Sequence, residues 1–286
     1  MDNSRILIVG AYGQLGKALN AKYPGATAVD RDTFDMTDWE MLENYDWSKY
    51  DVILNAAVYA NVNGAEEGDG RIAAWLVNAT GPSYLSKVAS KHSITLVHVS
   101  SDYVFDGRKR PHTETEPFSP VNVYGQSKAA GDLAVGLAPQ HYIVRTTWLI
   151  GDGPNFVRTM AALARKDVSP TVVDDQIGRL TFTPTLVGAI DHLLTSKAPY
   201  GTYNTTNDGK VTSWADITEE IFKDLGRDDL HVTRTSTEEY DAGKQDIAPR
   251  PLLSEMDLSK LIASGYQPND WQADLAQYIK DGHAEL

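Results

Sequence analysis

The chain has 286 residues, of which 42% are hydrophobic and 23% charged, a composition typical of an ordinary globular protein. Its formal net charge of −13 argues against a protein that binds nucleic acid or an anionic membrane. The sequence contains no cysteine, which excludes disulfides, thiolate zinc sites and cysteine nucleophiles.

The N-terminal sequence MDNSRILIVG lacks the basic segment and long apolar core of a signal peptide. No apolar run reaches the roughly 18 residues that a membrane span requires. We therefore expect a cytoplasmic protein that does not enter a membrane.

Short β-branched runs alternate with longer amphipathic segments through the first half of the chain. This alternation predicts a parallel sheet covered by helices on both faces. In the segment 37–45, Thr37 and Glu40 have the spacing of a capping box, which predicts that the helix begins at Thr37. We expect strands at 5–10, 26–30, 51–55, 94–101 and 141–148, and helices at 14–23, 37–45, about 71–91 and around the YGQSK segment.

The pattern loosens after about residue 150, where proline and acidic turn residues become more frequent. Helices are still expected at about 155–166, 184–196 and 214–225, and the segment 234–251 is expected to be an irregular connection. We predict a Rossmann-type, doubly wound α/β domain over residues 1–150, to which a later segment at about 170–205 adds. A smaller, discontinuous α/β domain for substrate binding is expected mainly over residues 151–286.

Three glycines, Gly10, Gly13 and Gly16, follow the first strand and open the first helix. Glycine allows a tight turn and a close approach of the backbone to a ligand. The helix N-terminus offers free N–H groups and a positive dipole end to a pyrophosphate. In this strand–turn–helix context the spacing GxxGxxG predicts a dinucleotide site.

Asp30 ends the second strand, where a carboxylate can accept hydrogen bonds from the adenosine ribose of NAD. Arg31 follows it and could instead bind the 2′-phosphate of NADP, so the choice between NADH and NADPH stays open. Asp35 and Met36 are candidates for contact with the adenine. Small residues such as Ala57 at the end of the third strand would let a cofactor pass over the edge of the sheet.

Tyr124 and Lys128 are four residues apart in VNVYGQSK, so on a helix they share one face. A lysine cation next to a phenol is expected to lower the pKa of Tyr124 and to prepare it for proton transfer. Ser101, at the end of the fourth strand, could hydrogen-bond a substrate carbonyl. Together with the glycine turn, these three residues predict hydride transfer between a nicotinamide and a carbonyl.

Over nearly its whole length the chain resembles the dTDP-4-dehydrorhamnose reductase family, which lies within the extended short-chain dehydrogenase/reductase superfamily. The stretches that carry the resemblance are ILIVGAYGQLG, NAAVYANVNGAEE, SSDYVFDG, VNVYGQSKAAGD, VRTTWLIGDGPNFVRTM, VVDDQIGRLTFTPTL, GTYNTTNDGKVTSWADI and RPLLSEMDLSKL. The resemblance implies NADPH- or NADH-dependent reduction of the C4 ketone of dTDP-4-dehydro-L-rhamnose, the last step of dTDP-rhamnose synthesis.

The resemblance also implies roles for individual residues. Arg250 could meet the diphosphate or form a plain salt bridge, and Trp148 could face the sugar or belong to the core. The residues that would touch the cofactor are Gly13, Gln14, Leu15, Asp30, Asp35, Met36, Val58, Tyr59, Ala60, Val99, Tyr124 and Lys128. The residues that would face the dTDP-sugar are Ser101, Asp102, Tyr103 and Trp148.

Several alternatives remain open from the sequence. Some members of the family are magnesium-linked dimers, but no carboxylate set here matches that metal site, and the acidic residues Glu66, Glu67 and Asp69 are expected to form a solvated face. We expect a monomer or a homodimer. The competing functions are a reductase or epimerase for another nucleotide sugar, and a non-catalytic NADP-binding regulatory subunit.

Overall fold

A parallel sheet forms the centre of the computed structural model, which describes residues 1–285. Within these residues the sheet has six strands in the order β10-β5-β4-β3-β1-β2. The strands are β1 (Ile6–Val9), β2 (Thr27–Val29), β3 (Val52–Asn55), β4 (Thr95–Ser101), β5 (His141–Thr146) and β10 (Gly201–Asn204). The chain reverses its direction of travel across the sheet between β1 and β3, which confirms the predicted Rossmann-type fold.

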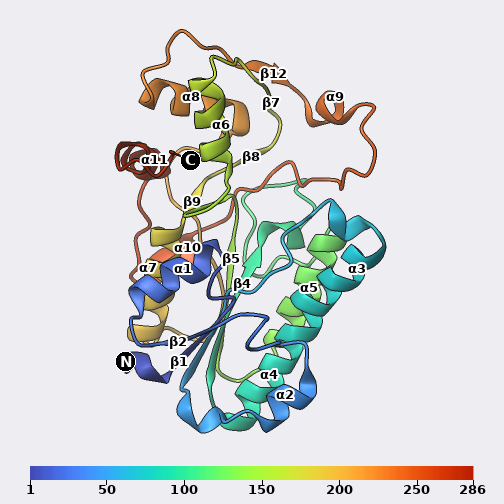
Figure 1. Ribbon diagram of the computed structural model, residues 1–286, viewed down its shortest axis with the longest axis vertical. Coiled ribbons are helices and arrows are strands. Elements are labelled where there is room, and N and C mark those ends of the chain that lie inside the picture. Colours follow the sequence, from blue (N-terminus) through green and yellow to red (C-terminus); the bar gives the residue numbers. More distant parts are fainter. Residues whose placement is uncertain (286) are drawn as a thin grey trace.

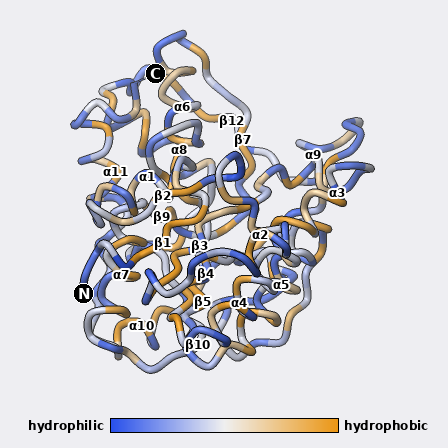
Figure 2. Tube along the Cα trace, turned by 60° about the horizontal axis from the view of Figure 1, so that its bottom comes forward, coloured by the Kyte–Doolittle hydropathy of each residue, from blue (hydrophilic) through white to orange (hydrophobic). Residues whose placement is uncertain are grey.

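Helices cover both faces of this sheet (Figure 1). On one side lie α1 (Gln14–Lys22) and α7 (Thr183–Thr195), and on the other lie α2 (Trp39–Asn44), α3 (Gly68–Trp75), α4 (Gly81–His92) and α5 (Val123–Val135). Successive residues of a strand point to opposite faces. Accordingly, Ile6 and Ile8 join the core under α1 and α7, while Leu7 and Val9 join the core under α4. Figure 2 shows hydrophobic residues along these central strands.

The helix expected at about 71–91 is interrupted by a π-helical turn, η4 (Leu76–Thr80), between α3 and α4. Asn78 in this turn is buried and accepts a hydrogen bond from the Tyr59 backbone N–H at 2.9 Å. It also donates to the Tyr59 carbonyl at 3.2 Å and to the Ser127 hydroxyl at 3.0 Å. The turn therefore joins the loop after β3 to α5, and such π turns are frequent at functional sites.

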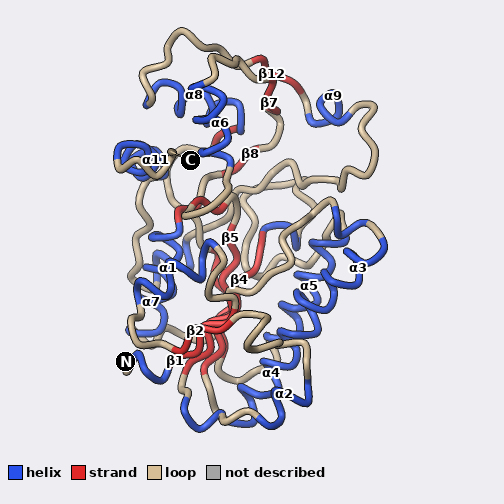
Figure 3. The backbone as a smooth tube through the Cα atoms, in the orientation of Figure 1, coloured by secondary structure: helices blue, strands red, loops and turns tan. Residues whose placement is uncertain are grey.

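A second, smaller core lies beyond the carboxyl ends of the central strands. It packs α6 (Phe156–Arg165), α8 (Trp214–Asp224) and α11 (Trp271–Lys280) together. Figure 3 shows the short strands of this region, which pair as β6 (Leu149–Ile150) with β9 (Thr181–Phe182), β7 (Thr171–Val173) with β12 (Thr233–Thr235), and β8 (Ile177–Gly178) with β11 (Thr212–Ser213). Strand β10 belongs to the central sheet, and α7 packs on it, although both come after residue 150 in the chain. The predicted division into a domain over residues 1–150 and a second domain over residues 151–286 stays a prediction.

Two local expectations differ from the structure. α2 is capped by Asp38, whose carboxylate accepts from the Met41 N–H at 3.1 Å, because the Thr37 hydroxyl is already donated to Asp35 at 2.6 Å. The segment expected to be irregular contains the end of β12 and a short helix, α9 (Thr237–Asp241). The remaining short elements are η1 (Asn3–Arg5), η2 (Trp47–Lys49), η3 (Gly64–Glu66), η5 (Asp102–Val104) and α10 (Ser259–Ala263).

None of the helices in residues 1–285 is long and apolar enough to cross a membrane.

Candidate active site

The three glycine positions of the first turn lack a side chain for different structural reasons. Gly10 has a φ of +77°, and a Cβ there would lie 2.6 Å from the backbone of Ala57. A Cβ on Gly16 would collide with the carbonyl oxygen of Gly10. Gly13, the N-cap of α1, has only the Gly10 oxygen near its Cβ position, at 3.5 Å. The first and third glycines thus pack the turn, while the second leaves space at the helix N-terminus.

A cavity of about 410 Å³ opens between this turn and η4. It brings together the following predicted residues: Gly10, Gly13, Arg31, Asp35, Met36, Ala57, Val58 and Tyr59. Phe34, Thr37, Ala73, Leu76 and Val77 also line it and had no recognisable signal in the sequence. Its position at the switch point and its apolar walls fit the adenosine half of a dinucleotide.

Asp30 is engaged in its own turn through one carboxylate oxygen, and its role as a ribose ligand stays a prediction. Its carboxylate accepts from the Asp32 N–H at 3.2 Å and from the Thr33 hydroxyl at 3.4 Å, so it caps its own turn. Arg31 is exposed and lines the cavity. In residues 1–285, Arg31 forms no ion pair, which leaves its guanidinium available to an anion.

A larger cavity of about 820 Å³ lies next to Gly13, at the carboxyl ends of β4 and β5. It gathers the predicted residues Gly13, Gln14, Leu15, Val58, Ala60, Val99, Ser101, Asp102, Tyr103, Tyr124, Lys128 and Trp148. Sequence reasoning missed Tyr12, Lys17, Val62, Ser100, Thr146, Thr147 and the segment 152–155, which also line it.

Helix α5 carries two of the central residues of this cavity. It begins at its N-cap Asn122, whose side chain accepts from the Gly125 N–H at 2.7 Å and donates to the Pro249 carbonyl at 2.7 Å. Lys128 donates from Nζ to the Val99 carbonyl at 2.7 Å. The rings of Tyr124 and Tyr103 meet edge to face at 5.5 Å. The phenol and the ammonium are therefore held at the end of β4.

Protonation in this site is governed by burial. Burial raises the pKa of Tyr124 above its ordinary value, Asp102 and Tyr103 raise it further, and a hydrogen bond with Ser101 counteracts this. Burial also lowers the pKa of Lys128 to about 8, against the opposing effect of Asp132. The expected lowering of the Tyr124 pKa by Lys128 is therefore wrong for this structure, because burial of the phenol is the largest cause and raises the pKa.

Asp102 is 2% exposed, and both of its carboxylate oxygens are engaged. Oδ1 accepts from the Ser101 hydroxyl at 2.9 Å, and Oδ2 accepts from the Ser254 hydroxyl at 2.6 Å. Burial raises the pKa of Asp102, and these two hydrogen bonds oppose the change. The carboxylate thus orients Ser101 from behind, and Ser254 is a site residue that sequence reasoning missed.

Trp148 adopts a φ of +47°, a conformation that is rare for a large side chain and requires tertiary support. Its ring stacks on Trp214 with centroids 3.9 Å apart. Trp148 lines the 820 Å³ cavity, whereas Trp214 lines a third cavity of about 420 Å³. The aromatic pair therefore stands between the two cavities.

The third cavity combines aromatic rings with cationic side chains. Phe156, Trp214 and Tyr240 line it together with Lys244 and Arg250. Arg250 donates from Nη2 to the Asn63 amide oxygen at 2.7 Å. Its buried Nη1 has no hydrogen-bond partner within residues 1–285, so this cation can still bind an anion.

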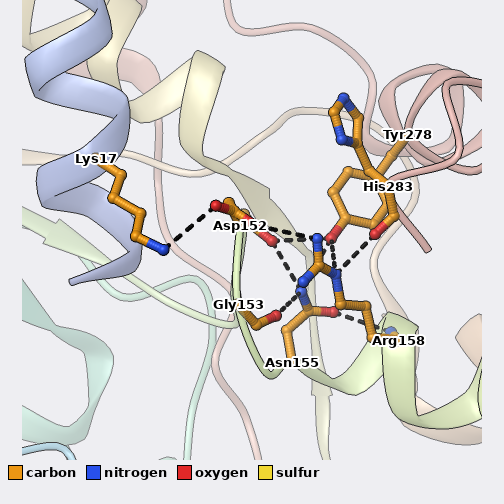
Figure 4. A network of polar contacts seen from close by, with 8 residues as sticks. Lys17, Asp152, Gly153, Asn155, Arg158, Tyr278 and His283 are labelled. Carbon is orange, nitrogen blue, oxygen red and sulfur yellow. Dashed lines mark hydrogen bonds and ion pairs between the residues drawn. The ribbon is translucent and has the colours of Figure 1, made fainter. Parts of the chain in front are cut away.

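The segment 151–155 borders the large cavity and is held by a polar network (Figure 4). Asp152 accepts from Lys17 of α1 at 3.4 Å and from Arg158 of α6 at 3.2 Å. Asn155 caps α6 by accepting from the Arg158 N–H at 3.0 Å, and the Tyr278 hydroxyl donates to the Gly151 carbonyl at 2.8 Å. These contacts join the cofactor side of the cavity to the smaller core.

Buried polar atoms test whether the large cavity suits a nicotinamide nucleotide. Ser100, Thr146 and Thr147 line this cavity, and in the described part of the chain their buried hydroxyl oxygens have no hydrogen-bond partner. A polar ligand with donors and acceptors would satisfy them. Over the same residues, no three His, Asp or Glu side chains cluster closely enough to hold a metal ion.

Comparison with known proteins agrees with this arrangement. The family model described as the RmlD substrate binding domain matches residues 4–283. A dTDP-4-dehydrorhamnose reductase of Aggregatibacter actinomycetemcomitans is 36% identical, over 95% of this chain and 97% of the relative. A dTDP-4-keto-6-deoxy-D-glucose reductase of Streptomyces niveus is 38% identical, over 84% of this chain and 85% of the relative.

Among solved structures, dTDP-4-dehydrorhamnose reductase from Bacillus anthracis in complex with NADP is 32% identical to this chain. The two superpose with a TM-score of 0.88, over 97% of this chain and 99% of the other. The matches in sequence and in structure extend across both cores and all three cavities. The chain therefore belongs to the dTDP-4-dehydrorhamnose reductase family.

Proposed function

We propose that this protein is an NAD(P)H-dependent reductase that converts the C4 ketone of dTDP-4-dehydro-L-rhamnose to the alcohol of dTDP-L-rhamnose. One observation carries the proposal: Ser101, Tyr124 and Lys128 meet in the cavity that begins at the glycine turn. The two adjoining cavities match the two halves of a dinucleotide, and the third suits a nucleoside diphosphate. The proposed cofactor-binding and substrate-binding residues are those that line these cavities.

When bound, a reduced nicotinamide supplies the hydride that reaches the ketone carbon. Tyr124 donates the proton that completes the alcohol, and its raised pKa means that the phenol keeps this proton at neutral pH. Lys128 of α5, whose Nζ donates to the Val99 carbonyl of β4, would hold the nicotinamide ribose. Ser101, oriented by Asp102, lies with Tyr124 in the same cavity, where its hydroxyl would bind the reacting oxygen.

The nucleotide end of the substrate is proposed to occupy the third cavity. Aromatic faces such as those of Trp214 and Phe156 suit a base, and a guanidinium such as that of Arg250 suits a diphosphate. Asn63 fixes the Arg250 side chain in this position. The sugar would then extend past Trp148 toward Tyr124.

Replacing Arg250 by methionine should raise the KM for the dTDP-sugar by about 10–100-fold, because a charge-assisted bond to the diphosphate is lost. The kcat should change little, since Arg250 lies away from the reacting carbon. Steady-state kinetics at saturating cofactor measure both constants. Arg234→Met, which removes a cation that pairs with Asp216 and Glu219, serves as the control and should leave KM unchanged.

Replacing Arg31 by alanine should weaken NADPH binding about 10-fold and leave NADH binding unchanged, because only NADPH carries the 2′-phosphate. The hydrogen bonds that Asp30 accepts within its own turn involve only Oδ1, so Oδ2 is left to accept from the ribose of either cofactor. Fluorescence titration with each cofactor checks this expectation. An equal loss for both cofactors would contradict the role given to Arg31.

Loss of nicotinamide absorbance with dTDP-4-dehydro-L-rhamnose tests the proposed function directly, with NADH and NADPH offered separately. The Streptomyces niveus relative favours one second candidate, reduction of dTDP-4-keto-6-deoxy-D-glucose, so this sugar is assayed in parallel. Preferential turnover of the rhamnose precursor supports the proposal, and preferential turnover of the glucose derivative supports the second candidate. A protein that binds NADPH but turns over neither sugar would overturn both in favour of a regulatory subunit.

A further inference from the structure

Helix α5 covers the same face of the sheet as α4, and this face changes from apolar to polar toward the carboxyl ends of the strands. Four neighbouring strands each contribute a buried polar side chain there: Asn55 from β3, His98 from β4, Arg145 from β5 and Asn204 from β10, all at most 3% exposed. Burial of polar groups is costly unless they have partners. In this layer Asn55 pairs with His98, and Asn204 donates to the His112 carbonyl, whereas Arg145 bonds to α5.

Asp132 of α5 is the anion of this layer and is 2% exposed. Its Oδ2 accepts from Arg145 Nε at 2.9 Å. Its Oδ1 lies 3.9 Å from His98 Nε2 and has no hydrogen-bond partner within residues 1–285. Burial lowers the pKa of His98, with Lys128 contributing, so this imidazole is neutral. Arg145 therefore bonds to only one oxygen of the Asp132 carboxylate, and the other oxygen accepts no hydrogen bond from the described residues.

Lys128 is the second buried cation near Asp132, at 1% exposed. Tyr124, Lys128 and Asp132 follow one another at intervals of four residues, which places them along one face of α5. A buried ammonium is costly unless an anion is close. Asp132 is the carboxylate one helical turn deeper than Lys128, on the side away from the cavity.

We propose that Asp132 is a positioning residue: its buried carboxylate, fixed by Arg145 and one helical turn from Lys128, supplies the negative charge that keeps the buried Lys128 ammonium charged beside the reaction cavity. The consequence for the reaction rests on the proposed reductase function, whereas the relation between the two side chains does not. Burial lowers the pKa of Lys128 to about 8, and Asp132 is the group that opposes this fall. Without Asp132, Lys128 would lose its proton nearer to neutral pH.

Other charged or titratable groups around this face of α5 are already engaged elsewhere. The sheet contributes His98 and Arg145, which contact Asp132 itself. From η5 come Asp102, bound to two serine hydroxyls, and Tyr103. Glu66 of η3 accepts from the Val123 N–H at 2.8 Å. The competing explanation is that Asp132 serves only to neutralise Arg145 during folding.

The test compares three variants with the wild type, after thermal melts have established that each is folded. In Asp132→Asn the basic limb of the kcat/KM profile should move to lower pH by about one unit, since a nearby charge shifts a pKa by roughly that much or more. Asp132→Glu keeps the charge and should restore the limb. Arg145→Met should move the limb to higher pH, because the carboxylate then acts on Lys128 alone.

NADPH affinity measured against pH by fluorescence titration gives a second readout that needs no turnover. Its decline at high pH should shift in the same directions as the kinetic limb, downward in Asp132→Asn and upward in Arg145→Met. Unchanged pH dependence in a folded variant would overturn the proposal and leave Asp132 a purely structural partner of Arg145. If either Asp132→Asn or Arg145→Met does not fold, the pH shift of the other variant still tests the role of Asp132, because each variant has its own expected direction.

The two proposals fail in distinguishable ways. A wild-type protein that reduces no dTDP-4-keto sugar refutes the proposed function, yet the binding titrations still report on Lys128. Turnover by the wild type with no pH shift in any variant refutes the role of Asp132 alone.

Discussion

Replacing Tyr124 by phenylalanine is expected to lower kcat by about 10²–10⁴-fold, the usual contribution of a positioned proton donor. The hydroxyl is the only group removed, and the ring keeps its edge-to-face contact with Tyr103. NADPH affinity should therefore stay within about two-fold of the wild type, since Lys128 keeps its place at the Val99 carbonyl. Single-turnover measurement of nicotinamide oxidation separates the chemical step from cofactor binding.

Tyr103→Phe is the matched control, because it removes a neighbouring hydroxyl from the same cavity. Burial raises the pKa of Tyr103 to about 12, and Arg250 acts in the opposite direction. Loss of the Tyr103 hydroxyl is expected to affect KM more than kcat. Equal effects of the two substitutions on kcat would contradict the assignment of Tyr124 as the proton donor.

Replacing Gly16 by alanine is expected to destabilise the protein by about 1–3 kcal/mol, as overpacking does. Without such a collision, alanine in place of glycine inside a helix stabilises the protein by about 1 kcal/mol. The sign of the change in the free energy of unfolding therefore shows whether the collision occurs. The added Cβ collides with the Gly10 oxygen, which separates α1 from the turn and should abolish NADPH binding. Urea unfolding and fluorescence titration measure the two effects.

Gly13→Ala separates packing of the turn from approach of the ligand. At this N-cap the new Cβ meets only the Gly10 oxygen, at 3.5 Å, so the free energy of unfolding should fall by about 1 kcal/mol or less. The methyl group would stand in both cofactor cavities and should weaken NADPH binding at least about 10-fold. A Gly16→Ala protein as stable as the wild type would show that the predicted collision does not occur.

Local periodicity and turn chemistry were readable in the sequence. The alternation of strands and helices predicted the parallel sheet, and the spacing of Gly10 and Gly16 predicted a tight turn before α1. The interval between Tyr124 and Lys128 predicted a shared helix face. These inferences succeed because each depends on residues within one or two helical turns of each other.

Contacts between distant segments were not readable in this way. Ser254 meets Asp102, and Trp214 stacks on Trp148, although long stretches of chain separate the members of each pair. The third cavity likewise combines Asn63, which precedes η3, with residues of α6, β7, α8, α9 and the segment after α9. No local pattern distinguishes such residues from ordinary core or surface positions.

The sequence by itself thus determined the class of fold, the glycine turn that opens α1, and the shared helix face of Tyr124 and Lys128. Only the tertiary structure decided their protonation. A sequence shows that Lys128 is close to Tyr124, but not that both are buried, and burial reverses the expected direction of the Tyr124 pKa. The physical reason is that hydration is lost through packing of the whole chain, whereas the spacing of two side chains on a helix is a local property.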